Sequence, residues 1–502
     1  MKPFTKQASI ANALTCSFIL LLSLAACQQT KLVFTDTKPP VISKFTALKG
    51  APDVSLEEGQ HRAWNVKKIS ANLTLHQYPS SPSELVYLHL SLINPNRPFN
   101  NIDVLNTTLY QKAYRLAATA NLSCIESLRI NASMHSIGLQ MACPNEEVAP
   151  ALTLLAKTWQ ADAFDDLDLD TVRRQLKLNK HINAYSGGEI ETVWAKKILG
   201  ERHPYNLSLR NQALQDELTN EELVKLQAAL LIGSTWHLLT SAKGGEHIDL
   251  VKNLALKLPD QTFSSNIDES SSNLKLNSQQ NLNQHSQKRL YIIDAPGAVQ
   301  TQVRVGYRLP ITTSTFQKKA DNEFNKSEPL TCQILASWLG RSFSGRLYYD
   351  LREQRGLTYG IYGRCFDNPL ARTLKFYGST QLQHSGAFIS GILDHLALAK
   401  ETKIKEAELL AIKVHEKSKY RLRSQSINSA FAYYIKHLAH GRVESESSQQ
   451  KQISQLSIQA LQHMAQDLFL TPPTILIRGD LDKIKKDLQQ KLPHWQIIQI
   501  EP

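Results

Sequence analysis

The sequence has few residues in the arrangements that commonly carry chemistry. It contains six cysteines in 502 residues, and no two are spaced as Cys-x-x-Cys, so a cysteine-based zinc site has no support. Neither a Gly-x-Ser-x-Gly turn nor a Walker-type phosphate loop is present. No basic run is interleaved with aromatic residues, which argues against nucleic acid as a partner. The net charge of +12 therefore suits acidic peptides or an anionic membrane surface, unless it is spread over a solvated surface.

The N-terminus reads as a bacterial export signal. Lys2 and Lys6 make a positive start, and a mostly apolar run follows from residue 10 to 24. The run is shorter than the ~20 apolar residues that a membrane-spanning helix needs. It ends in Leu-Ala-Ala-Cys, which resembles the lipobox of bacterial lipoproteins. We expect residues 1–26 to be removed and Cys27 to carry lipid; the alternative is that Cys27 merely ends an ordinary secretory signal. Because Gln28, not Asp, follows, we expect the outer membrane, facing the periplasm.

The remaining cysteines divide evenly along the chain. Cys16 leaves with the signal, so Cys124 and Cys143 remain in the first half, and Cys332 and Cys365 in the second. In an oxidising compartment, one pair in each half permits two disulfides. Four buried free thiols are the alternative.

The length predicts two domains. Residues 27–65 show no clear periodicity and read as a tether, whereas residues 259–288 are rich in Ser, Asn and Gln and read as a linker. The flanked domains, 66–258 and 289–502, follow a similar order of elements. Both end in a strand, a glycine turn and an amphipathic helix that stops at Leu-Pro. A duplication with a period of about 230 residues is therefore expected, which is too long for a solenoid.

Several strands are predicted from apolar patterns. Residues 85–93 alternate apolar and polar side chains, as in a half-buried strand. Further strands are expected at 127–134, 136–142 and 235–242 in the first half, and at 290–294, 303–309 and 474–480 in the second.

The most informative segment covers residues 340–363, GRSFSGRLYYDLREQRGLTYGIYG. Leu347 and Leu351 are four residues apart, on one face of a predicted helix. Gly356 can adopt the left-handed conformation that ends a helix, and residues 358–365 read as a strand. This places Arg352 in the last helical turn, where a cation suits the helix dipole, and Tyr359 at the start of the strand. The bend can bring both side chains toward one face.

This segment resembles the second-domain motif of the insulinase/pitrilysin metallopeptidases, which read much like L-R-E-x-R-G-L-x-Y. The resemblance covers 289–502 well. It covers 66–258 weakly, through the element order and the HPYN turn at 203–206. It implies an α+β fold of two tandem domains, in a family where two such pairs close around a peptide and one pair binds zinc.

The resemblance also implies roles for two residues. Arg352 would hold a substrate carbonyl, and the Tyr359 hydroxyl would stabilise the tetrahedral oxyanion. Without the resemblance, Arg352 reads as a surface charge at a helix end, and Tyr359 as an interface aromatic.

The zinc motif of this family is missing. His-x-x-Glu-His does not occur, and the stretch where it would fall, Ile102–Ala117, contains no His and no Glu. The third ligand would lie within Thr171–Gly188, which contains no carboxylate. His437 and His440 are three apart, but Gly441 follows directly, so we interpret them as surface or groove residues.

We therefore expect no metal in this chain. It would form the zinc-free half of an envelope peptidase whose partner carries His-x-x-Glu-His and zinc, with the substrate peptide added to a sheet edge. The alternatives are a catalytically dead scaffold or peptide-binding lipoprotein, and a self-sufficient zinc enzyme with unusual ligands.

Overall fold

The structure is a computed structural model that describes residue 41 and residues 64–78, 83–160, 166–186, 188–207, 218–243, 247–259, 287–310, 323–441 and 446–501. Cys27, nearly all of the predicted tether and most of the predicted linker lie outside these ranges. We call residues 64–259 the first half and residues 287–501 the second half. Of the helices in the described ranges, none combines the length and the apolarity needed to cross a membrane.

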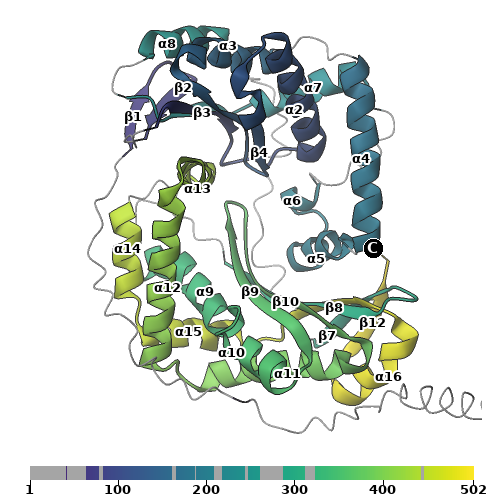
Figure 1. Cartoon of the computed structure of the whole chain (residues 1–502). Coiled ribbons are helices and arrows are strands. Elements are labelled where there is room, and N and C mark those ends of the chain that lie inside the picture. The colour runs from purple at the N-terminus through teal and green to yellow at the C-terminus, as the bar shows by residue number, and fades with distance from the viewer. Residues whose placement is uncertain are drawn as a thin grey trace, which may run out of the picture. The chain divides into compact units, whose positions relative to one another are not determined.

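The described elements of the first half are β1 (Asn65–Lys68), β2 (Leu73–Gln77), β3 (Leu85–Ile93), α2 (Ile102–Thr119), η1 (Ser123–Ser127), β4 (Arg129–Ser133), β5 (Ser136–Pro144), η2 (Asn145–Glu147), α3 (Val148–Thr158), α4 (Asp166–Ser186), α5 (Glu189–Leu199), α6 (Pro204–Leu207), α7 (Asn220–Leu231), β6 (Thr235–Thr240) and α8 (Ile248–Lys257). They are labelled in Figure 1.

Those of the second half are β7 (Arg289–Asp294), β8 (Gln300–Leu309), α9 (Glu323–Gly340), α10 (Arg346–Tyr348), η5 (Tyr349–Gln354), β9 (Thr358–Asn368), β10 (Ala371–Gln381), η6 (Leu382–His384), α11 (Ser385–Glu401), α12 (Glu406–Gln425), α13 (Ile427–Ala439), α14 (Glu446–Gln455), α15 (Ile458–Leu468), β11 (Thr474–Gly479), α16 (Leu481–Lys491) and β12 (Gln496–Ile500). The mixture of sheets and helices confirms the predicted α+β class.

The two halves share a sheet topology. The first sheet has the order β1-β2-β6-β3-β5-β4, and the second has the order β12-β7-β11-β8-β10-β9. In both sheets, the second and third strands of the order are parallel to each other. The next three pairs of neighbours (third–fourth, fourth–fifth and fifth–sixth) are antiparallel. Only the first strand differs, because β1 is antiparallel to β2 whereas β12 is parallel to β7. This shared order is what a duplicated domain would produce.

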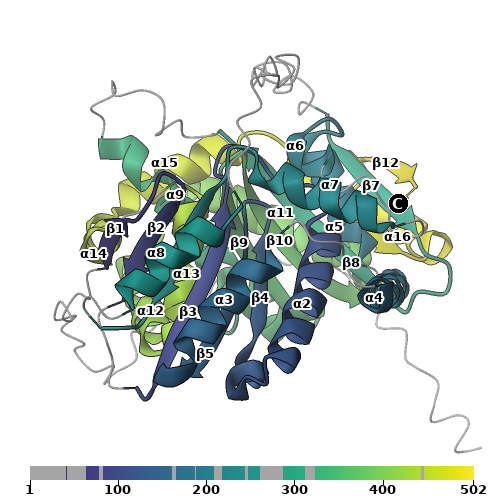
Figure 2. The ribbon, with the colours of Figure 1, turned by 90° about the horizontal axis from the view of Figure 1, so that it is seen from above.

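One face of the first sheet packs against its own helices. Leu88, Leu90 and Leu92 of β3 are buried with apolar side chains of α2, α3 and α8, and these helices lie over the strands when seen from above (Figure 2). Burial of this apolar surface is the main contribution to the stability of the half.

The other face of this sheet is also covered, by a helix of the second half. Phe431, Tyr434 and Ile435 of α13 form one apolar cluster with Ile93 and Leu239 of the first sheet. His89 and Ser91 of β3 are consequently buried. The prediction that residues 85–93 form a strand is confirmed, but the expectation that it is half-buried is wrong for residues 88–93, because α13 covers the more polar face.

A helix of the first half covers the second sheet in return. Ile190, Val193 and Trp194 of α5 form a cluster with Ile293 and Leu476 of the second sheet. The strands β5 and β10 occupy the same, fifth, position in the two sheet orders. The third α-helix after β5 is α5 and the third after β10 is α13, so α5 and α13 are equivalent helices. Each half therefore uses the equivalent helix to cover the sheet of the other half.

Candidate functional site

Arg352 and Tyr359 flank a tight helix–turn–strand segment. The short helix α10 continues into the π-helix η5, which contains Arg352. Gly356 then adopts φ 64°, and its N–H donates to the carbonyl of Arg352 at 3.0 Å. A side chain at this φ would be strained, so glycine suits the turn. The predicted helix end at Gly356 is thus confirmed, and β9 begins two residues later at Thr358.

A buried ionic triad fixes the end of this helix. Asp350 accepts hydrogen bonds from Arg355 at 2.9 Å and from His395 of α11 at 2.8 Å. Burial raises the pKa of Asp350, but the hydrogen bonds from His395 and Arg355, and their charges, outweigh it and hold the pKa below its ordinary value. The carboxylate is therefore charged. Its bond with Arg355 closes the end of the helix that carries Arg352, and its bond with His395 joins that helix to α11.

Close backbone contacts hold the same segment against α9. A Cβ at Gly340 would lie 2.2 Å from the backbone nitrogen of Gly363, so glycine allows α9 to lie directly on β9. A disulfide between Cys332 of α9 and Cys365 of β9 joins the two elements covalently. The segment is consequently anchored on both sides of the turn.

Arg352 lies over aromatic rings and remains partly open to solvent. Its guanidinium carbon is 4.8 Å from the ring centre of Tyr348 and 6.0 Å from that of Phe343, which are cation–π distances. Its side chain is 36% exposed, and its Nε forms an ion pair with Glu353 at 3.5 Å. An arginine stacked by its face keeps its N–H edges available to a ligand.

Tyr359 is the second residue of β9. It is 83% exposed, which is unusual for a large aromatic residue inside a strand. Within the described part of the chain, no hydrogen bond joins Tyr359 to Arg352. Because Arg352 is partly exposed and Tyr359 is largely exposed, both side chains can donate to a ligand.

An ion pair joins α2 and α4, the helices on which the resemblance places the zinc ligands. Arg115 of α2 lies 2.8 Å from Asp168 at the start of α4. Lys112, also on α2, is buried and donates to the carbonyl of Gln160 at 2.8 Å. The resemblance places the His pair on α2, and the buried Lys112 on this helix opposes the binding of a divalent cation there.

The other pair of cysteines joins η1 to β5. Cys124 and Cys143 form a disulfide, and Glu147 lies beside it and accepts the backbone N–H of Cys124 at 3.3 Å. These three side chains are close enough to hold a metal ion, but disulfide sulfur atoms are not thiolate ligands.

The HPYN turn connects two hairpins. The Tyr205 hydroxyl lies 2.8 Å from Nε2 of His135, at the β4–β5 turn, and accepts the backbone N–H of Leu370, at the β9–β10 turn. His203 contacts the carbonyl of Leu370 at 3.1 Å. Sequence reasoning found the turn but missed this role, because its partners are 70 to 167 residues away.

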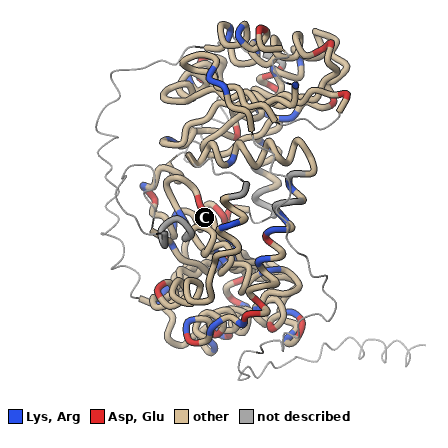
Figure 3. Tube along the Cα trace, turned by 90° about the vertical axis from the view of Figure 1, so that its left-hand side faces the viewer, with Lys and Arg blue, Asp and Glu red and all other residues tan. Residues whose placement is uncertain are grey.

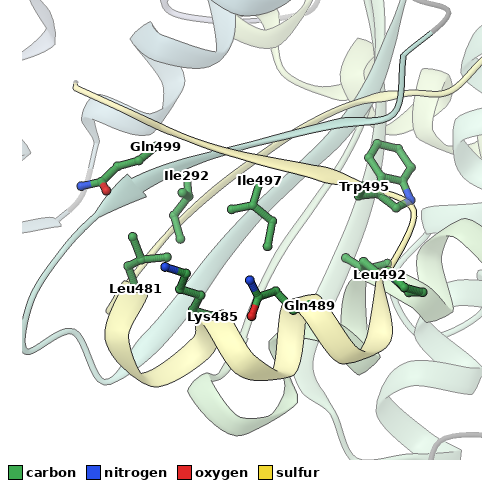
Figure 4. A pocket seen from close by; sticks show the side chains of 9 residues that line it. Ile292, Leu481, Lys485, Gln489, Leu492, Trp495, Ile497 and Gln499 are labelled. Carbon is green, nitrogen blue, oxygen red and sulfur yellow. The ribbon is translucent and has the colours of Figure 1, made fainter.

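The remaining histidine pair and the pocket suggest no catalytic centre. His437 is at the end of α13, His440 follows it, and Gly441 has φ 64°. A pocket of about 540 Å³ lies between α16, β7 and β12 (Figure 4) and is lined by Ile292, Leu481, Lys485, Gln489, Leu492, Pro493, Trp495, Ile497 and Gln499. Lys485 is the single charged residue of this lining, so the pocket offers no acid–base pair.

Lys and Arg residues are distributed over both halves and are not confined to one of them (Figure 3).

Residues 250–414 match the family model of the "Peptidase M16 inactive domain". This range begins in α8 and ends in α12, and it includes Arg352 and Tyr359. The description as inactive agrees with the expectation that this chain holds no catalytic zinc, and the match supports the resemblance to the insulinase-type (M16) peptidases. No curated protein matches the sequence.

Solved structures share the fold at low sequence identity. A protease from Helicobacter pylori superposes with a TM-score of 0.64 at 12% identity, covering 83% of this chain and 99% of that one. A peptidase M16 inactive domain from Pseudomonas fluorescens gives 0.63 at 14%, covering 83% and 98%. A conserved protein from Enterococcus faecalis gives 0.59 at 14%, with the same coverages. The fold over both halves is therefore that of these proteins.

Proposed function

We propose that this chain is the non-zinc-binding subunit of a heteromeric zinc peptidase in the bacterial envelope. It would supply Arg352 and Tyr359 to an active site whose zinc is held by a second chain with a His-x-x-Glu-His motif. The observation that carries the proposal is the 83% exposure of Tyr359, in a rigid segment of an M16-like fold. A tyrosine hydroxyl that projects from a rigid segment is suited to stabilise the charge that develops on a substrate bound at the zinc of another subunit.

The contacts between α2 and α4 support the proposal that another chain supplies the zinc site. The Arg115–Asp168 ion pair and the buried Lys112 occupy the helices that would otherwise carry the metal ligands. The fold is present but the zinc ligands of the family are not, so catalysis would require a zinc site on a second chain.

Co-purification from native membranes tests the proposal. The tagged chain should retain a partner that carries His-x-x-Glu-His, and metal analysis should find about one zinc in the complex and none in this chain alone. Peptide cleavage should appear only in the complex and should be lost with a chelator. A chain purified without partner that holds one zinc and cleaves peptides would contradict the proposal. A partner-free chain that binds peptides without cleaving them would favour the peptide-binding lipoprotein instead.

A further inference from the structure

Phe343 has an unusual combination of exposure and backbone conformation. It is 80% exposed, and its φ is 64°. Among the described residues other than glycine, three more have a positive φ, and they are two asparagines and a histidine. Those residue types tolerate this conformation better than bulky apolar ones do. Because Phe343 also gains little from burial, neither packing nor local preference accounts for a phenylalanine at this position.

The loop that carries Phe343 is closed by hydrogen bonds. It connects α9 to α10, and the N–H of Gly345 donates to the carbonyl of Arg341 at 2.7 Å. Nε of Arg341 donates to the hydroxyl of Ser344 at 2.6 Å. A Cβ at Gly345 would lie 2.4 Å from the backbone nitrogen of Arg341, so this close turn requires glycine. The surrounding loop therefore fixes the unfavourable φ of Phe343, at a cost in stability.

The ring of Phe343 forms a corner with the ring of Tyr348. The two ring centres are 5.2 Å apart, and their planes are inclined at 51°. The guanidinium carbon of Arg352 lies 4.8 Å from the ring centre of Tyr348 and 6.0 Å from that of Phe343, within cation–π range of both. Tyr348 is only 2% exposed and is held in the core, whereas the exposed Phe343 forms the other wall of the corner.

A second uncommon backbone feature contains Arg352 itself. The segment Tyr349–Gln354 is a π-helix, and the N–H of Arg355 accordingly donates to the carbonyl of Asp350 at 2.9 Å. Turns of this kind are rare and are frequent at functional sites. Strained residues such as Phe343 also cluster at such sites, where the strain can be part of the mechanism. Both features meet at one guanidinium, which indicates that its position matters for function.

We propose that Phe343 is a positioning residue for Arg352, whose guanidinium it holds in place for the carbonyl of the substrate. The inference rests on the proposed function, in which Arg352 binds that carbonyl. An arginine side chain loses rotamer freedom when it binds a ligand. The walls formed by Phe343 and Tyr348 restrict the guanidinium before the substrate arrives, so less entropy is lost on binding. The strain at Phe343 thus lowers the stability of the chain but strengthens substrate binding.

Substitutions that tolerate a φ of 64° separate positioning from a structural role. Asn and Gly adopt this φ more readily than Phe, so Phe343→Asn and Phe343→Gly should raise the urea midpoint of unfolding of the full chain. In the complex with the zinc-bearing partner, Phe343→Asn should raise KM about two- to fivefold, as the loss of an exposed cation–π contact would, and should change kcat little. Phe343→Tyr keeps the ring and should keep KM within about twofold of the wild-type value.

Two comparisons identify what the ring acts on. Leu470 is 74% exposed and follows α15, so Leu470→Ala shortens a comparably exposed apolar side chain and should leave KM unchanged. In the Arg352→Ala background, Phe343→Asn should raise KM no further, because a residue that acts through the guanidinium has no effect once the guanidinium is gone. An undiminished rise in that background would mean that Phe343 contacts the substrate or the partner directly, and it would overturn the inference.

Chemical modification of the purified chain tests the contact without the partner. Phenylglyoxal reacts with guanidinium groups, and mass spectrometry of the peptide that contains Arg352 gives its rate of modification. This rate should rise about two- to fivefold in Phe343→Asn, because the ring no longer covers the guanidinium. It should stay near the wild-type rate in Phe343→Tyr and in Leu470→Ala. An equal rate in Phe343→Asn and the wild type, or a lower urea midpoint in both Phe343→Asn and Phe343→Gly, would overturn the inference.

Failure of the proposed function would give a different result. The modification rate would still rise in Phe343→Asn, but the wild-type chain would cleave no peptide together with a zinc-bearing partner. That outcome would leave the contact between Phe343 and Arg352 in place. It would remove the proposed reaction, and with it the substrate carbonyl that the contact is proposed to serve.

Discussion

The carboxylate of Glu191 on α5 lies 2.6 Å from the ammonium of Lys375 on β10, 184 residues later in the chain. The same carboxylate lies 2.7 Å from Nε of Arg304 on β8. Burial raises the pKa of Glu191, but the hydrogen bond and charge of Lys375 and the charge of Arg304 outweigh it, so the pKa lies below its ordinary value. One acidic residue of the first half thus compensates two cations of the second sheet.

Glu191→Gln should destabilise the protein. The side chains of Arg304 and Lys375 are only 11% and 8% exposed, and they would face each other without an anion. Removing one partner of a buried pair costs about 3–5 kcal/mol, and we expect about 1–3 kcal/mol here because Glu191 is 47% exposed. Urea unfolding measures the loss. The control Glu221→Gln removes the acid of an exposed pair with Lys225 and should leave the unfolding midpoint unchanged; equal effects in both variants would refute the special role of Glu191.

Asp350→Asn should affect both stability and the position of Arg352. The substitution keeps the size of the side chain but leaves Arg355, 6% exposed, without its buried counter-charge. We expect a loss of about 3–5 kcal/mol in unfolding free energy. In a reconstituted complex, turnover should fall at temperatures where the variant remains folded. Wild-type stability in Asp350→Asn would show that the triad does not anchor the helix.

Buried histidines predict sensitivity to acid. Burial lowers the pKa of His89 to about 3 and that of His237 to about 4. Burial, and then the charge of His237, lowers the pKa of His76 to about 3. The unfolded chain takes up these protons near pH 6.5, whereas the folded chain does so only near pH 3–4. Between these limits the unfolded state binds more protons, so stability should fall as the pH is lowered below about 6.5.

The slope of unfolding free energy against pH checks this directly. His89→Leu should reduce the slope between pH 4 and 6 by up to about 1.4 kcal/mol per pH unit, because it removes one such group. His494→Gln, which changes an exposed histidine, should leave the slope as in the wild type. An unaltered slope in His89→Leu would mean that His89 titrates alike in both states.

Much of the fold could be read from the sequence, because it depends on local patterns. The bounds of β3 agree with the predicted 85–93, and Gly356 was recognisable as a helix end from its place after Arg355. The strands β1, β2 and β12 were missed. β1 is exposed along its whole length, so its residues show no alternation of apolar and polar side chains.

The contacts between the halves could not be read in this way. The Glu191–Lys375 pair and the packing of Tyr434 beside His76 join residues 184 and 358 positions apart. Neither is encoded by spacing along the chain, and both depend on the exchange of α5 and α13 between the sheets. Of the candidate site, the sequence indicated Arg352 and Tyr359 through a motif, but it did not indicate the supporting bond from Asp350 to His395 on another helix.

Lipidation at Cys27 remains a prediction of the sequence. Cells given a labelled fatty acid should incorporate it into the wild-type protein and not into Cys27→Ala, because the thiol is the acceptor of the lipid. The variant should also move from the membrane fraction to the soluble fraction of the envelope. Equal labelling of both proteins would refute the lipoprotein assignment.

Tyr359→Phe should lower the turnover of the reconstituted complex while leaving assembly intact. The side chain is 83% exposed, so the loss of its hydroxyl breaks no buried contact and should not alter folding. If that hydroxyl donates to a developing oxyanion, its removal should cost about a hundred- to a thousand-fold in kcat, or roughly 3–4 kcal/mol.

Tyr362→Phe is the matched control for this prediction. Tyr362 lies on the same strand, is 41% exposed, and packs 5.5 Å from the ring of Tyr377, so it should lose little activity. Arg352→Ala should mainly raise KM, with a smaller fall in kcat, if the guanidinium holds the substrate carbonyl equally in the ground state and the transition state. Steady-state cleavage is measured beside a pull-down that confirms assembly. Full turnover in both Tyr359→Phe and Arg352→Ala would assign these residues a structural role and favour a scaffold protein, because a catalytic donor cannot be removed without raising the barrier that it lowers.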